Sequence, residues 1–133
     1  MSISTAETAT ASVWAGRIIS GLVIAFLVLD AAMKLVPVEP AMLAMRGLGF
    51  PDSVALARGL GALLLACTLL YAFPRTAVLG AVLLTGYLGG TVVTHLRLGH
   101  PWLSHVLFGV YVGVAAWAGL LARRAELRPL MFP

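Results

Sequence analysis

Four long stretches of apolar residues, bounded mainly by proline and charged side chains, set the pattern of this chain. They cover residues 13–36, 53–73, 76–96 and 102–122. At about 1.5 Å of helical rise per residue, a stretch of this length spans roughly 30 Å, the thickness of the hydrocarbon core of a bilayer. None shows the strict alternation that a membrane β-strand requires. The pattern predicts an all-α protein, an integral membrane bundle of four transmembrane helices.

The links between the stretches predict how the helices are arranged. Residues 74–76 and 97–101 are short links that favour tight antiparallel hairpins, and these predict an up-down-up-down bundle. The first link, residues 37–52, is longer. Its middle, residues 41–48, has two interpretations, a short amphipathic turn at the membrane interface or an irregular apolar loop.

The two ends of the chain differ from the apolar stretches. Residues 1–12 are mainly Ser, Thr and Ala with one acid, and we expect a flexible N-terminal tail. They carry no basic segment, and no small-residue cleavage site follows the first apolar stretch, so a retained membrane anchor is favoured over a cleaved secretory signal. Residues 123–133 are expected to form a basic C-terminal tail.

Composition narrows the class of protein. Of the 133 residues, 61% are hydrophobic and 11% are charged, against about 45–50% and 25% in soluble domains. This excludes a disordered protein and argues strongly against a soluble enzyme. The single cysteine, Cys67, excludes an internal disulfide and a Cys-x-x-Cys relay. The basic side chains lie at the ends of apolar stretches rather than along one face, so we expect the lipid bilayer, and not nucleic acid, as a partner.

Lysine and arginine residues near the helix ends predict the orientation, because they are enriched on the cytoplasmic side of a membrane. One side of the predicted bundle carries five of them: Arg17, Arg75, Arg123, Arg124 and Arg128. The other side carries four: Lys34, Arg46, Arg58 and Arg97. The first set includes a cluster beyond the last apolar stretch, whereas Lys34 and Arg58 lie inside apolar stretches. We therefore expect both termini in the cytoplasm.

Polar side chains inside the apolar stretches need a reason, because a charge in a membrane helix costs a few kcal/mol. In the first stretch Asp30 precedes Lys34 by four residues, the favourable order for a helical ion pair. In the third stretch four polar residues share one helical face: Tyr87, Thr91, Thr94 and His95.

The predicted topology brings polar residues from four helices to one end of the bundle. Tyr87 lies roughly 15 Å deeper than Arg97 by helical rise. We expect it to form the floor of a cavity that opens at this end of the bundle. The candidate pocket consists of Asp30, Lys34, Arg58, Tyr87, Thr91, Thr94, His95, Arg97 and His105. The alternative is a structural polar network, in which the cations reach the lipid headgroups and the threonines bond their own helix backbone.

Three histidines are evenly spaced at positions 95, 100 and 105. Pro101 interrupts any helix that would carry all three. A haem would need facing histidines on two helices, which only His95 and His105 supply. We expect neither a metal nor a haem.

Small residues recur four apart in three of the stretches. The second has Gly59, Gly61, Ala62 and Ala66, the third Gly86-x-x-x-Gly90, and the fourth Gly109-x-x-x-Gly113. In membranes this spacing lets helix backbones approach closely. It favours packing within one bundle over a face for dimerisation.

The region from residue 74 to residue 97 supplies a recognisable set of motifs. They are the turn Pro74-Arg75-Thr76, the segment Thr85-Gly86-Tyr87-Leu88-Gly89-Gly90 and the end Thr94-His95-x-Arg97, with Lys34 at the end of the first stretch. On these residues the chain resembles the DoxX-like membrane protein family over about residues 17–121. The resemblance implies a small four-helix bundle in the bacterial inner membrane. Many relatives carry an acid early in the second helix, where this chain has only Arg58, so no role that depends on that acid is expected here.

The wider DoxX superfamily includes a small subunit of a thiosulfate:quinone oxidoreductase and members associated with redox or stress functions. The resemblance thus implies a quinone as one candidate ligand, or an accessory redox-associated subunit. Three hypotheses remain open. The protein binds a small lipophilic molecule in the pocket, or it is an enzyme that uses Asp30 or His95 as acid or base, or it is a structural subunit that forms a homodimer or assembles with a partner membrane protein.

Overall fold

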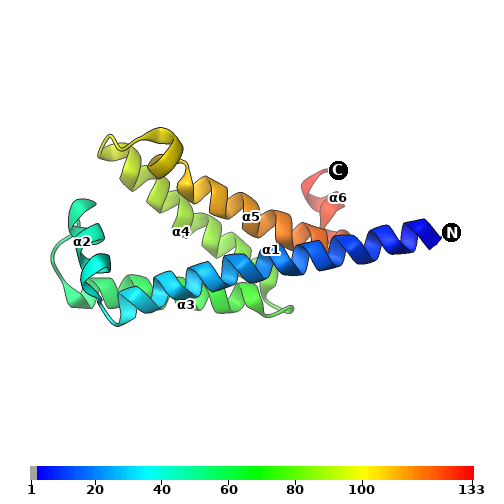
Figure 1. Cartoon of the computed structure of the whole chain (residues 1–133), viewed down its shortest axis with the longest axis horizontal. Helices are drawn as coiled ribbons and strands as arrows, with labels where there is room; N and C mark the ends of the chain where they lie inside the picture. The colour runs from blue at the N-terminus through cyan, green and yellow to red at the C-terminus, as the bar shows by residue number, and fades with distance from the viewer. Residues whose placement is uncertain (1–2) are drawn as a thin grey trace.

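The computed structural model describes residues 3–133, and helices account for every regular element in that range. Four of them are long: α1 (Ile3–Leu35), α3 (Val54–Ala72), α4 (Ala77–Arg97) and α5 (Phe108–Arg123). Shorter elements occupy the connections and the C-terminus: α2 (Glu39–Gly47), the π-helical turn η1 (Trp102–Val106), the 3-10 turn η2 (Ala125–Leu127) and α6 (Arg128–Met131). The long helices lie together as one bundle (Figure 1).

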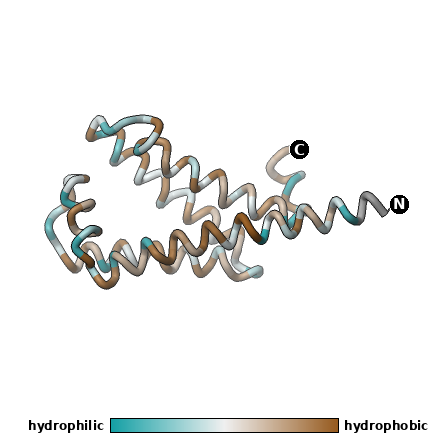
Figure 2. The backbone as a smooth tube through the Cα atoms, viewed as in Figure 1, coloured by the Kyte–Doolittle hydropathy of each residue, from teal (hydrophilic) through white to brown (hydrophobic). Residues whose placement is uncertain are grey.

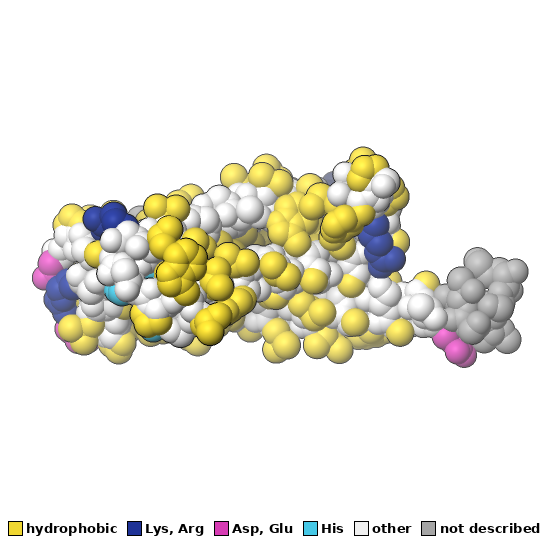
Figure 3. Space-filling view, turned by 90° about the horizontal axis from the view of Figure 1, so that it is seen from above, with side chains coloured by type: hydrophobic (Ala, Val, Ile, Leu, Met, Phe, Trp, Pro, Cys, Tyr) yellow, Lys and Arg dark blue, Asp and Glu magenta, His cyan; other side chains and the backbone are white. Residues whose placement is uncertain are grey.

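Four segments of the described chain are long and apolar enough to cross a bilayer: Glu7–Leu35, Val54–Ala72, Ala77–Arg97 and Trp102–Arg123. Their outer faces carry large apolar side chains such as Leu22, Leu63 and Val114, each more than half exposed. Figure 2 shows hydrophobic residues along all four helices, and Figure 3 shows them spread over one face of the molecule. The predicted four-helix bundle is confirmed, and the chain is a multi-pass membrane protein in contact with the lipid bilayer.

Each long helix packs against two others. α1 lies against α3 and α5, and α4 closes the ring by contacting the same two helices. In Figure 1, α4 and α5 diverge from α1 and α3 towards the end that carries α2. The bundle is therefore closed at one end, where α3 turns into α4, and splayed at the other.

Glycine contacts and a buried tyrosine hold the closed end together. Gly80 of α4 faces the end of α3 so closely that a Cβ there would lie 2.1 Å from Tyr71 N. Gly16 makes a similar approach from α1 to the backbone of α5. The Tyr71 hydroxyl donates a hydrogen bond to Ala116 O at 2.6 Å and lies 3.0 Å from Ser20 Oγ. Because lipid provides no hydrophobic drive between helices, such contacts decide how membrane helices associate.

The first link contains a short helix, α2, with one buried and one exposed face, so this link is not an irregular loop; its place at the membrane interface stays a prediction. Pro40 occupies its first turn, where a proline removes no hydrogen bond. Met42 and Met45 are buried on one face and pack towards α3. On the exposed side, Arg46 Nη2 donates to Glu39 Oε1 at 2.7 Å, and this hydrogen bond raises the pKa of the Arg46 guanidinium above its ordinary value.

Both ends of the chain differ from the tails expected from composition. α1 already begins at Ile3, because residues 3–12 contain three alanines and neither glycine nor proline to stop a helix. At the other end, η2 and α6 fold back onto α1. Arg128 Nη2 donates to Ser12 Oγ at 2.9 Å, and Ser12 in turn donates to Ala122 O at 2.8 Å. Residues 1 and 2 of the expected tail lie outside the described range.

Trp14 and Arg17 mark one level along α1, at the closed end of the bundle. Trp14 is 57% exposed, and the guanidinium carbon of Arg17 lies 5.3 Å from the centroid of its ring. Exposed tryptophan and arginine are typical of the membrane–water interface. Arg123 and Arg124 lie at the same end and donate to backbone carbonyls at or just beyond the end of α3. The basic cluster predicted here therefore also binds helix ends.

Gly80→Ala should destabilise the bundle, whereas Gly21→Ala should not. The methyl group at Gly80 meets backbone atoms that can move only if α3 and α4 separate, and overpacking of this kind costs about 1–3 kcal/mol. At Gly21 no atom lies within 4 Å of the added Cβ, and alanine favours the helix. Circular dichroism during thermal unfolding in detergent should show a lower midpoint for G80A only. Equal midpoints would contradict this account of the closed end.

Candidate functional site

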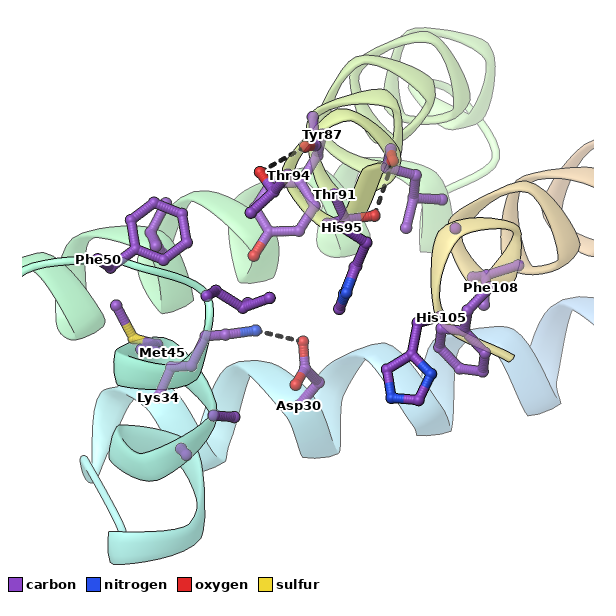
Figure 4. Close-up of a pocket in the computed structure, with 18 of the residues that line it drawn as sticks. Asp30, Lys34, Met45, Phe50, Tyr87, Thr91, Thr94, His95, His105 and Phe108 are labelled. Carbon is purple, nitrogen blue, oxygen red and sulfur yellow. Dashed lines mark hydrogen bonds and ion pairs between the residues drawn. The ribbon is translucent and has the colours of Figure 1, made fainter. Parts of the chain in front are cut away.

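A cavity of about 770 Å³ occupies the splayed end of the bundle. Small-molecule sites in proteins typically measure about 300–1,000 Å³. Its wall comes from α1, α2, α4, η1 and α5, while α3 contributes Leu60. Most of this wall is apolar and includes Phe26, Leu27, Met45, Phe50 and Phe108. Polar side chains from α1, α4 and η1 point towards one another between these residues (Figure 4).

The cavity brings together seven of the residues predicted to form a pocket: Asp30, Lys34, Tyr87, Thr91, Thr94, His95 and His105. Arg58 and Arg97 do not line it. The Nε of Arg58 donates to Leu35 O at 3.2 Å, and Nη2 of Arg97 donates to Leu48 O at 3.3 Å. Both arginines are exposed, and both bind carbonyls at the ends of α1 and α2, where helices leave acceptors without intrahelical donors. They therefore connect the elements around the cavity from outside.

Asp30 and Lys34 form an ion pair in the wall of the cavity. Lys34 Nζ donates to Asp30 Oδ2 at 2.5 Å, and the lysine side chain is the more buried of the two. Gly61 of α3 packs against the backbone of α1 and against the Cβ of Lys34, and the lysine also lines the cavity. The Tyr87 hydroxyl points towards the pair (Figure 4). The opposite charges compensate each other, as charges inside a membrane span must.

The two threonines of α4 bond their own helix. Thr91 Oγ1 donates to Leu88 O at 2.7 Å, and Thr94 Oγ1 donates to Gly90 O at 2.8 Å. This is the behaviour that the structural alternative predicted for them. Their hydroxyl oxygens keep lone pairs, so towards the cavity they act only as hydrogen-bond acceptors.

The turn between α4 and η1 brings the three histidines together. Gly99 adopts φ +71°, a conformation that favours glycine, and the backbone N–H of His100 then donates to His95 O at 3.2 Å. After Pro101, η1 winds as a π-helical turn and returns His105 to the same place. The ring centroids of His95, His100 and His105 lie 5.0–5.7 Å apart. Pro101 therefore breaks the helix, as predicted, but gathers the rings instead of separating them.

His95 and His100 also share a direct hydrogen bond. Their Nδ1 atoms lie 2.7 Å apart, and His105 Nδ1 bonds Ser104 Oγ at the same distance. His100 lines the cavity but was missing from the predicted pocket; only its even spacing with the other histidines pointed to it. Within residues 3–133, no group of three or more His, Cys, Asp or Glu side chains is arranged to hold a metal ion.

The glycine pattern of α4 serves the cavity and not helix packing. Gly86 and Gly90 line the cavity, and a Cβ at either would find no atom within 4 Å. The prediction that this pair packs against another helix is wrong, because the splay of the bundle removes the neighbour. Gly109 does pack closely, since a Cβ there would lie 2.6 Å from Thr91 Oγ1. Gly61, described above, is the corresponding contact of α3.

Phe26 and Phe108 form an aromatic contact across α1 and α5. Their ring centroids lie 5.6 Å apart in an edge-to-face arrangement, and each side chain is 45% exposed. Both also line the cavity. The pair therefore forms the part of the cavity wall where α1 meets α5, and each ring keeps nearly half of its surface accessible.

These features define a class: a small multi-pass membrane bundle that is closed at one end and carries a partly polar cavity at the other. The DoxX-like family matches residues 18–119, which is most of the chain, and the protein belongs to this family. No curated protein and no solved structure matches the chain.

Removing one partner of the Asp30 and Lys34 pair should destabilise the protein more than removing both. Asp30→Asn leaves the ammonium of Lys34 without a counter-charge, and Lys34→Met leaves the carboxylate. Because Asp30 is partly exposed, we expect a coupling free energy of about 1 kcal/mol between the two substitutions, at the upper end of the range for exposed ion pairs. Unfolding of the two single variants and the double variant in detergent measures it. Additive effects would show that the pair contributes nothing to stability.

Proposed function

We propose that this protein binds a small lipophilic molecule in the cavity at the splayed end of its bundle. The observation that carries this proposal is the mixture of groups in the wall. Aromatic and aliphatic side chains form most of it, with an ion pair, a tyrosine and three histidines placed among them. Sites for small ligands have this composition, and polar groups at membrane depth commonly mark function.

The open face of α4 supports the same proposal. In a membrane bundle, glycines normally let two backbones meet, yet Gly86 and Gly90 face the cavity. A missing side chain there gives a ligand access to the helix backbone. A quinone is one ligand that suits this wall, because Lys34 and Tyr87 are donors that its carbonyls can accept from.

The acid–base alternative has weaker support. Lys34 already holds the carboxylate of Asp30, so Asp30 cannot take a substrate proton without weakening this ion pair, and His95 is engaged with His100 through its Nδ1. A structural subunit remains the second candidate, since Gly59 and Gly89 are exposed small residues with open space around them. Such positions suit a second copy or a partner membrane subunit.

Filling the cavity from α4 should expel the ligand. Gly86→Leu and Gly90→Leu add a side chain where the fold leaves space, so they should reduce ligand binding without preventing folding. Gly89→Leu is the matched control, because Gly89 is equally unobstructed but does not line the cavity. Mass spectrometry of the intact protein released from native membranes should show a bound lipophilic molecule in the wild type and G89L, and lose it in the other two.

The same spectra report any partner protein. A wild type that carries no bound molecule after gentle release, or equal occupancy in all four proteins, would refute ligand binding in this cavity. A stoichiometric second subunit that is lost in G89L would favour the structural candidate instead.

We place the protein in the bacterial inner membrane with both termini in the cytoplasm. Arg17, Arg123 and Arg124 lie at the closed end, which also carries both chain ends in Figure 1. Cytoplasmic ends of membrane helices are enriched in such residues.

Cysteine labelling tests this orientation. In a Cys67→Ala background, a membrane-impermeant thiol reagent applied to intact spheroplasts should label Leu98→Cys and leave Leu130→Cys unlabelled. Both positions are exposed, so accessibility does not limit the reaction. Labelling with the opposite preference would reverse the orientation.

A further inference from the structure

A groove of about 510 Å³ lies at the closed end of the bundle, apart from the cavity at the splayed end. One side of it is the part of α1 that projects beyond the bundle in Figure 1. The other side is the segment where α5 turns into η2 and α6. Most of its lining is small and uncharged, as at Ala9, Ser12 and Ala125, and Arg128 is the only charged side chain among the described residues that line it.

The guanidinium of Arg128 is fixed in place by three neighbours. Its Nε donates to Leu121 O at 3.0 Å, and its Nη2 donates to Ser12 Oγ at 2.9 Å and to Ala122 O at 3.3 Å. These bonds occupy three of the five N–H groups that a guanidinium carries. Among residues 3–133, Nη1 has no hydrogen-bond partner, so two N–H groups remain available. All three acceptors are neutral, and they leave the positive charge uncompensated.

The charged residues around the groove add to this positive charge. The closed end carries five arginines, of which Arg128 is one, and two acids, Glu7 and Glu126. Glu126 already accepts a hydrogen bond from Arg124 at 3.0 Å. Arg128 takes part in none of the ion pairs found among residues 3–133. The excess of cations means that this end of the bundle attracts an anion.

The groove lies at the depth of the lipid headgroups. With Trp14 and Arg17 at the membrane–water interface, helical rise places Ser12 about 3 Å and Thr8 about 9 Å further from the hydrocarbon core. The headgroup layer is about 5–8 Å thick on each side of that core. Because Arg128 bonds Ser12, its guanidinium lies within this layer. Lipid phosphates are therefore its immediate neighbours.

We propose that this groove binds the headgroup of an anionic phospholipid, with Nη1 of Arg128 donating to a phosphate oxygen. Guanidinium groups bind phosphate through charge-assisted hydrogen bonds. Since Arg128 is already held by three bonds, it loses little side-chain freedom when a lipid binds. The small side chains of the wall leave room for the headgroup. This site is separate from the cavity at the splayed end and does not depend on the proposed function.

Two phospholipids with identical acyl chains separate the charge of the headgroup from the chains. Phosphatidylglycerol is anionic, whereas the phosphate of phosphatidylcholine is compensated by the cation of its own headgroup. Each is added to the full-length protein in neutral detergent, and adducts of one lipid per chain are counted by native mass spectrometry. We expect phosphatidylglycerol to bind about fivefold better, which is the effect of one arginine near an anionic lipid surface. Equal binding of the two lipids would overturn the proposal.

Two substitutions test the groove itself. Arg128→Gln deletes the donor, and Ala125→Leu fills the groove while Arg128 stays in place, so each should remove the preference for phosphatidylglycerol. Arg75→Gln is the matched control, because Arg75 is an exposed arginine at the same end that does not line the groove. Gly86→Leu, which fills the other cavity, should also keep the preference. An equal loss in R75Q would reduce the effect to general surface charge, and a loss in G86L would place the lipid in the other cavity; either result contradicts the proposal.

The same measurement distinguishes other occupants of the groove. Glycerol 3-phosphate carries a phosphate without acyl chains, and at the lipid concentrations used it should give no adduct. An adduct as abundant as that of phosphatidylglycerol would show that the groove binds a soluble phosphate and not a lipid. A dimer of the wild type that is lost in R128Q and A125L, with no lipid preference in the monomer, would assign the groove to a second copy of the chain.

Discussion

Close approach of helix backbones at one end of the bundle governs the rest of this structure. At the closed end, Gly16 and Gly119 bring α1 and α5 together, and Gly80 brings α4 against the end of α3. Water does not drive these helices together inside a bilayer, so short-range contacts at small residues set the geometry. The other end receives α2 and the turn with η1, which are bulky connections rather than tight ones. The helices splay there, and the cavity is the space that this splay creates.

The polar groups of the membrane spans share one constraint, because acyl chains offer them no hydrogen-bond partner. Asp30 and Lys34 meet this constraint by pairing, and Thr91 and Thr94 meet it by bonding their own helix. Tyr71 does so at the closed end through Ala116 O. Within residues 3–133, the three histidines hydrogen-bond through Nδ1 alone. Their Nε2 atoms are the groups that a ligand site would use and that a purely structural polar network would not need.

Helical periodicity was sufficient to predict the spans, the ion pair and the polar stripe of α4, because each depends on residues within one helix. Which neighbour a helix face contacts depends on the angle between the helices, and this angle cannot be predicted from the sequence of one span. Gly86 and Gly90 therefore form an open wall where spacing indicated a contact. Arg58 and Arg97 have long side chains that reach carbonyls of other elements, so position near the pocket did not place them in it. His100 joined the site through a turn conformation that depends on Gly99.

The depth of the cavity follows from α1 itself. If Trp14 marks one interface, Lys34 lies twenty residues further along the same helix, which is about 30 Å, or one hydrocarbon thickness. The charged groups of the cavity thus sit where one leaflet changes from acyl chains to headgroups, while Phe26 and Phe108 lie beside the chains of that leaflet. Under the proposed function, a lipid-soluble guest in this leaflet would have its head and tail at these heights. It would reach the cavity by sideways movement in the plane of the membrane, with no passage through water.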